Sequence, residues 1–166
     1  MFSKTIQDAM NEQIKNELYS AYLYLSMAAY CESINLKGFA HWLRAQHEEE
    51  TGHAMKFFDF IHDRGGRVTL QAIAQPPTEF KSPLDVFEQT LEHERKVTAM
   101  INNIYALAVK ENDYASQALL QWFVTEQVEE EKNATEIVEK LKLVGDRGSG
   151  LLYLDHELGE REAEEE

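Results

Sequence analysis

Residues 47–53 have the sequence His47-Glu48-Glu49-Glu50-Thr51-Gly52-His53, inside a segment, residues 36–64, that otherwise has the apolar pattern of a long amphipathic helix. Glu50 and His53 are three residues apart, so on a helix they lie on neighbouring surface, one turn apart. At about 100° per residue, Glu50 falls on the line of the apolar residues Phe39, Leu43, Ala54, Phe57 and Ile61. A carboxylate on a face that a helix normally buries is costly unless it is paired or binds a metal. The rest of the chain must therefore supply its partner.

The same periodicity predicts three further long helices, over residues 4–33, 83–110 and about 114–144. A short fifth helix is expected over residues 151 to about 160. Leu25 is expected on the apolar face of the first helix. The expected secondary structure is therefore helical throughout.

Residues with known capping preferences mark several helix ends. Ser82 followed by Pro83 is a strong helix start, and Asp113 can cap the helix that follows it. Gly65 and Gly66 can supply the left-handed backbone that ends the helix before them.

The lengths of the connections predict the architecture. Short turns join the first two helices and the last two long ones, whereas residues 65–82, which include Pro76-Pro77, are too many for a hairpin between antiparallel neighbours. The predicted fold class is all-α, a four-helix bundle with one long crossover between the second and third helices plus a short C-terminal fifth helix. Residues 1–160 are expected to form one domain, and residues 161–166 an acidic disordered tail.

Composition excludes several classes of partner. A formal net charge of −14 argues against nucleic acid and anionic membranes and suits the handling of cations. The N-terminus lacks the apolar core of a signal peptide, and no apolar run approaches the length of a membrane span. One cysteine, Cys31, cannot form an internal disulfide, which fits a reducing cytosol. We therefore expect a cytoplasmic protein.

Each long helix has polar groups on its apolar face near mid-length: Glu17 and Tyr24, Glu50 and His53, Glu94, and Gln127 with Glu130. A lone glutamate of this kind more often reaches water at the edge of the face, and a lone histidine is more often a packing residue. Stacked in one bundle, these groups would place several carboxylates in a low-dielectric interior, where unpaired like charges are strongly destabilising. Cations resolve that conflict, and oxygen ligands with one imidazole suit iron or manganese better than a closed zinc site.

The chain resembles the non-haem ferritins of bacteria and archaea from its N-terminus to about residue 160. The resemblance is carried by Glu17, Glu50-x-x-His53, Glu94, Gln127-x-x-Glu130, Tyr24, the run at residues 126–131, and the turn Arg64-Gly65-Gly66-Arg67. It implies an iron-storage subunit that oxidises Fe(II) to Fe(III) with O2 or H2O2. It also implies a hollow shell, a homo-oligomer of 24 copies, in which ferric mineral is held.

The resemblance also implies roles for single residues. The first iron would be held by Glu17, Glu50 and His53, and the second by Glu50, Glu94 and Glu130, with Glu50 bridging. A third, cavity-side iron site would comprise Glu49, Glu126 and Glu129, joined to the pair through Glu130. Gln127 resembles the residue lining the oxygen side of the second site. Tyr24 resembles the tyrosine beside the centre, which donates an electron or hydrogen-bonds a ligand.

Two departures from related families refine this interpretation. The fullest di-iron carboxylate pattern has a second Glu-x-x-His on the fourth helix, where this chain has Gln127-x-x-Glu130. The second iron therefore lacks an imidazole and a bridging carboxylate, which favours a transit site over a retained di-iron cofactor. Bacterioferritins would place a haem-ligating methionine directly after the glutamate that corresponds to Glu50, where this chain has Thr51, so no haem is expected.

Two alternatives remain open from the sequence. A rubrerythrin-like di-iron peroxidase without storage usually carries a rubredoxin-like domain that needs four cysteines, and this chain has one. A non-catalytic helical-bundle assembly protein, with acidic faces toward water or a partner, would bind no iron.

Overall fold

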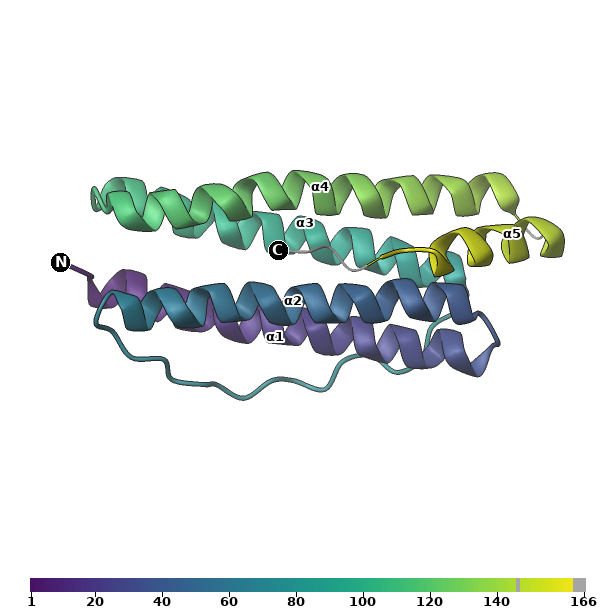
Figure 1. Ribbon diagram of the computed structural model, residues 1–166, viewed down its shortest axis with the longest axis horizontal. Helices are drawn as coiled ribbons and strands as arrows, with labels where there is room; N and C mark the ends of the chain where they lie inside the picture. The colour runs from purple at the N-terminus through teal and green to yellow at the C-terminus, as the bar shows by residue number, and fades with distance from the viewer. Residues whose placement is uncertain (146, 163–166) are drawn as a thin grey trace.

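The computed structural model describes residues 1–145 and 147–162, and all regular secondary structure within them is helical. The elements in chain order are α1 (Lys4–Ser33), α2 (Lys37–Asp63), α3 (Pro83–Lys110), α4 (Tyr114–Val144) and α5 (Gly148–Gly159). Helix α1 packs on α2, α3 packs on α4, and α5 lies at one end of the bundle (Figure 1). The predicted all-α four-helix bundle with a short fifth helix is confirmed. The fifth helix begins three residues earlier than expected.

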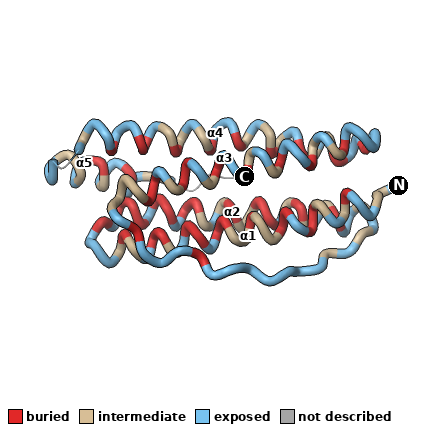
Figure 2. The backbone as a smooth tube through the Cα atoms, turned by 180° about the vertical axis from the view of Figure 1, so that it is seen from behind, coloured by how far each residue is buried: buried red, intermediate tan, exposed pale blue. Residues whose placement is uncertain are grey.

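The long connection between α2 and α3 runs along the outside of the α1–α2 pair (Figure 1). It is mostly exposed (Figure 2), and side chains of α1 hold it in place. Asn11 Nδ2 donates to the Arg67 carbonyl oxygen (3.1 Å), and Thr69 N donates to Asn11 Oδ1 (2.8 Å). Ser26 Oγ donates to the Pro77 carbonyl oxygen (2.6 Å). The crossover lets α3 run in the same direction as α2, as predicted.

The predicted caps form. Ser82 Oγ accepts a hydrogen bond from Asp85 N at the start of α3, and Asp113 Oδ1 accepts one from Ser116 N at the start of α4, both at 3.1 Å. Gly65 has φ = 76° after α2, a left-handed conformation that favours glycine. Local sequence therefore sets where these helices begin and end.

The bundle interior has two apolar parts with a polar layer between them. One part includes Met27, Phe39 and Phe87, and the other includes Phe57 and Phe123. Figure 2 shows the buried residues along the inner sides of the helices. The polar layer consists of the buried residues Gln13, Glu17, Gln46, Glu50, His53, Glu94, Gln127 and Glu130. The apolar parts stabilise a fold whose central layer is costly when its carboxylates are charged.

Leu25 does not lie in the core, and the expectation that it would is wrong. Its exposed fraction is 38%, whereas Ile6, Met10 and Ala28 on the same helix are buried. At about 100° per residue, Leu25 lies roughly a quarter turn from Ile6. That angle places it on the flank of the apolar face.

Helix α5, which packs against α2 at one end of the bundle, caps the start of α2. No side chain within α2 caps its N-terminus. Instead, Asp155 Oδ1 of α5 accepts a hydrogen bond from Phe39 N (2.9 Å). An acidic group at a helix N-terminus satisfies an orphan donor and meets the positive end of the helix dipole. Gly38 allows this approach, because a Cβ there would lie 1.6 Å from the Asp155 carbonyl oxygen.

Replacing Gly38 by alanine is therefore expected to displace α5. We expect a loss of about 1–3 kcal/mol in the free energy of unfolding, the usual cost of forcing extra volume into a packed contact. Thermal denaturation and protease sensitivity of the C-terminal region measure it. Gly148→Ala is the control, because a Cβ at Gly148 would meet nothing within 4 Å. Equal stability of the two variants would contradict the prediction.

The expected disordered tail, residues 161–166, is described only in part. Arg161 contacts α2, as set out below, so the ordered chain reaches at least this residue. Residues 163–166 lie outside the described part of the structure, and for them disorder stays a prediction. Among the described residues, no helix has the length and apolar character to cross a membrane.

Candidate metal centre

All four long helices contribute side chains to one site at mid-length of the bundle. The residues are Glu17 and Tyr24 of α1, Glu50 and His53 of α2, Glu94 of α3, and Gln127 and Glu130 of α4. Each of these residues is buried. The helical periodicity that places each one on an inward face also brings them to the same depth.

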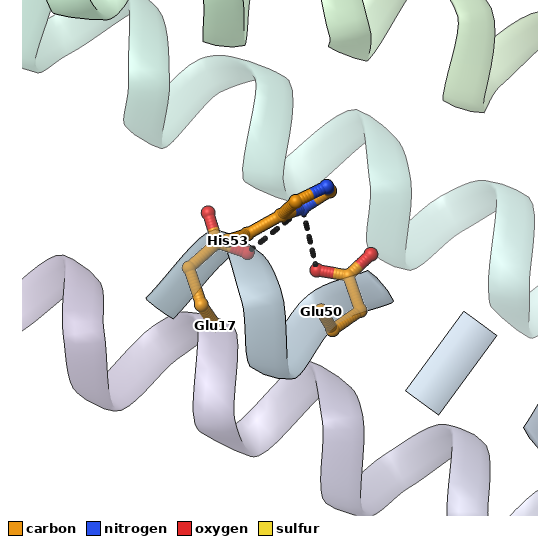
Figure 3. A group of neighbouring side chains, drawn as sticks. All are labelled: Glu17, Glu50 and His53. Carbon is orange, nitrogen blue, oxygen red and sulfur yellow. Dashed lines mark ion pairs between the residues drawn. The ribbon is translucent and has the colours of Figure 1, made fainter. Parts of the chain in front are cut away.

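Glu17, Glu50 and His53 form the first group of possible metal ligands. One ligand atom from each lies within 4.8 Å of the others. His53 Nδ1 is 3.4 Å from Glu50 Oε2 and 3.9 Å from Glu17 Oε2 (Figure 3). Glu17 Oε1 accepts a hydrogen bond from Gln13 Nε2 (3.0 Å). Glu17 Oε2 is buried and has no hydrogen-bond partner within the described residues. A buried carboxylate oxygen without a donor is costly, and a cation bound between these three groups would satisfy it.

Glu50, Glu94 and Glu130 form a second group, again with ligand atoms within 4.8 Å of one another. Glu50 belongs to both groups, so the two groups share one carboxylate side chain. Tyr24 donates its hydroxyl hydrogen to Glu94 Oε1. Gln127 Nε2 lies 3.1 Å from Glu94 Oε2 and 3.1 Å from the Glu94 carbonyl oxygen. Two neighbours therefore hold the Glu94 carboxylate in place.

Gln46 belongs to the site, and our sequence reasoning missed it. Its Nε2 donates to Glu130 Oε2 (2.7 Å) and to Glu50 Oε1 (3.1 Å), so one buried amide joins two of the carboxylates. Gln13 has the equivalent relation to Glu17. In both cases a glutamine stands four residues before the ligand glutamate, a spacing at which helical side chains meet. That repeated spacing was the signal that could have found them.

Burial raises the pKa of several of these carboxyl groups. Loss of solvation is the main cause for Glu94, whose pKa rises from 4.5 to about 7 although hydrogen bonds from Tyr24 and Gln127 favour its charged form. Desolvation, followed by the charges of the other carboxylates, raises the pKa of Glu50 and of Glu130 well above the usual value. Desolvation and the neighbouring carboxylates also raise the pKa of Tyr24, so its hydroxyl remains a donor. Without metal, protons therefore compensate part of the negative charge.

The three residues expected at a third site, Glu49, Glu126 and Glu129, each have different surroundings. Glu126 joins a group with His53 and Glu130. Glu129 is exposed, and Glu49 forms an ion pair with Arg161. Among the described residues, no group of three ligand atoms within 4.8 Å includes Glu49 or Glu129. The third site stays a prediction.

Comparison with known proteins places this geometry in a family. A family model described as a ferritin-like domain matches residues 7–144. The chain belongs to that family. A bacterial non-heme ferritin of Bacteroides fragilis is 45% identical over 161 residues, 97% of this chain and 100% of the relative. One from Campylobacter jejuni is 43% identical over 93% of both chains.

The solved structures agree with the family assignment. An open pore ferritin from the hyperthermophilic archaeon Archaeoglobus fulgidus has 52% sequence identity and a TM-score of 0.97, over 98% of this chain and 100% of that one. The identification with the non-haem ferritins of bacteria and archaea is confirmed, and so is the function it implies, an iron-storage subunit with ferroxidase activity. The two alternative functions are not favoured.

Proposed function

We propose that this ferritin subunit oxidises Fe(II) at a two-iron centre inside its own bundle. The supporting observation is that Glu50 belongs to both groups of three ligand residues. Glu17, Glu50 and His53 would hold one ion, and Glu50, Glu94 and Glu130 the other. Carboxylate oxygens with a single imidazole suit a hard or borderline ion such as iron. The second ion has only carboxylates, so we expect it to be held more loosely and passed on after oxidation.

In the proposed reaction, the buried carboxyl groups release protons and Fe(II) gives electrons to the oxidant. Binding of Fe(II) displaces protons from the buried carboxyl groups, because ligands must be deprotonated. Two Fe(II) ions then lose one electron each. One O2 molecule takes both electrons and leaves as peroxide, or one H2O2 takes them, its O–O bond breaks, and two hydroxide ions form. Hydrogen bonds from Tyr24 and Gln127 fix the Glu94 carboxylate, which would hold the second ion.

We further propose storage in a shell of 24 copies, as in the family, with a third iron site that includes Glu49, Glu126 and Glu129 on the way to the mineral. Exposed apolar side chains near the junction of α4 and α5, among them Leu143, Leu152 and Tyr153, offer a surface that neighbouring subunits would cover. The single cysteine supports a cytoplasmic location. A stable monomer in size-exclusion chromatography with light scattering would contradict the shell.

Anaerobic equilibrium dialysis against Fe(II) tests the proposed centre. We expect at least two ions per subunit in the unchanged protein, two of them at the proposed centre, and loss of the first-site ion in His53→Ala. Glu48→Ala is the matched control, because Glu48 is an exposed acid of the same helix. Failure of the unchanged protein to bind Fe(II) would refute the centre, and so would unchanged binding in the His53 variant.

A further inference from the structure

Residues 160–162, directly after α5, lie beside α2, where hydrogen bonds from Arg161 hold them. Arg161 Nη2 donates to Glu49 Oε1 (2.7 Å). Arg161 Nη1 donates to the carbonyl oxygen of Trp42 and to Gln46 Oε1, each at 3.1 Å. The guanidinium also lies over the Trp42 ring, 4.4 Å from its centroid. His41 Nε2 is 2.7 Å from the Arg161 carbonyl oxygen, so backbone and side chain are both held.

The contact with Gln46 links Arg161 to the metal centre. A guanidinium only donates hydrogen bonds, so the oxygen of the Gln46 amide must face it. The amide nitrogen must then face the other way, where it donates to Glu130 Oε2 (2.7 Å) and Glu50 Oε1 (3.1 Å). Gln46 is 1% exposed, so its amide has little access to water as an alternative hydrogen-bond partner. Arg161 therefore determines which way this amide points.

The contact with Glu49 places a positive charge beside the acidic cluster. The side chains of Arg161 and Glu49 are only 15% and 10% exposed, so solvent screens this ion pair less than a surface pair. An arginine does not lose its proton in a protein, so the charge is permanent. A metal ion that uses the same carboxylate must compete with it.

We propose that Arg161 is a positioning residue and an internal counter-cation of the iron path. Its guanidinium occupies the Glu49 carboxylate until Fe(II) displaces it, and through Gln46 it keeps the Glu130 carboxylate aimed at the second ion. The C-terminal segment thereby lowers the affinity for iron at the Glu49 side and favours the onward movement of iron toward the mineral. This inference rests on the proposed two-iron centre.

Anaerobic isothermal titration of the assembled protein with Fe(II) tests the inference without measuring turnover. In Arg161→Gln, the affinity for Fe(II) at the Glu49 side, identified as the class of bound ion that Glu49→Gln removes, is expected to rise by about threefold or more, since an ion pair of this kind is removed. Arg161→Met, which keeps an unbranched apolar side chain but removes the guanidinium, is expected to give the same gain and can be used if the glutamine variant does not fold. Arg161→Lys keeps the charge and should restore the original affinity.

Two controls separate a local effect from a general one. Lys140→Gln removes one positive charge from an exposed ion pair with Glu157 and should leave all Fe(II) affinities unchanged. The double variant Glu49→Gln/Arg161→Gln should lose the gain. The inference is overturned if Arg161→Gln binds like the unchanged protein, if Lys140→Gln shows the same gain, or if the double variant keeps it. If the unchanged protein binds no Fe(II), the two-iron centre itself fails.

Discussion

Replacing Glu50 by glutamine is expected to lower the rate of Fe(II) oxidation by at least about 100-fold, because loss of an outer-shell partner of a metal ligand already costs about 10–100-fold. Glu50 belongs to both ligand groups, so the substitution weakens the binding of both ions together. The glutamine amide keeps a similar size, and the change therefore removes charge with little loss of packing. Stopped-flow absorbance of Fe(III) formation measures the effect, with binding followed in parallel under argon.

The same substitution is expected to stabilise the metal-free bundle. Burial, followed by the neighbouring carboxylates, raises the pKa of Glu50, so near neutral pH folding must either bury a charge here or take up a proton, and a neutral amide avoids that cost. Urea unfolding with a chelator present should show a higher midpoint for Glu50→Gln than for the unchanged protein. Glu48→Gln, at an exposed position of the same helix, should change neither the oxidation rate nor stability. A variant that loses stability as well as activity would indicate that Glu50 is a packing residue.

Stability of the metal-free protein is expected to fall as the pH rises from about 4.5 to 7. Glu94 has a pKa of about 7 in the folded protein and 4.5 as its ordinary value, so between these values the folded state holds a proton that the unfolded chain has lost. Stability then decreases with pH, by about 1.4 kcal/mol per unit for each such proton. Burial and the neighbouring carboxylates also raise the pKa values of Glu50 and Glu130, which adds to the fall in stability with rising pH.

Urea unfolding at a series of pH values, in the presence of a chelator, measures this slope. Glu94→Gln removes one of the titrating groups and should flatten the curve between pH 5 and 7, whereas the Glu48→Gln control should not. The affinity for Fe(II) should instead increase as the pH rises from 5 to 7, because the ion displaces those protons. A metal-free protein whose stability rises with pH in this window would contradict the raised pKa of Glu94.

The sequence alone predicted the helices and their ends. Apolar periodicity placed four long helices, and Ser82, Asp113 and Gly65 marked boundaries that the structure confirms. These are local properties of the chain, since a cap or a helical face involves residues only a few positions apart. The same periodicity placed Glu17, Glu50, His53, Glu94 and Glu130 on inward faces, and their combination was recognisable as that of a ferritin.

Only the tertiary structure decided how these side chains meet. Periodicity shows which face a residue occupies on its own helix, but not which atom faces it from another helix. The hydrogen bond from Tyr24 to Glu94, the bond from Gln46 to Glu130, and the pairing of Glu49 with Arg161 all join separate elements. Arg161 is 112 residues from Glu49 along the chain, and only the position of residues 160–162 beside α2 brings the guanidinium to that carboxylate.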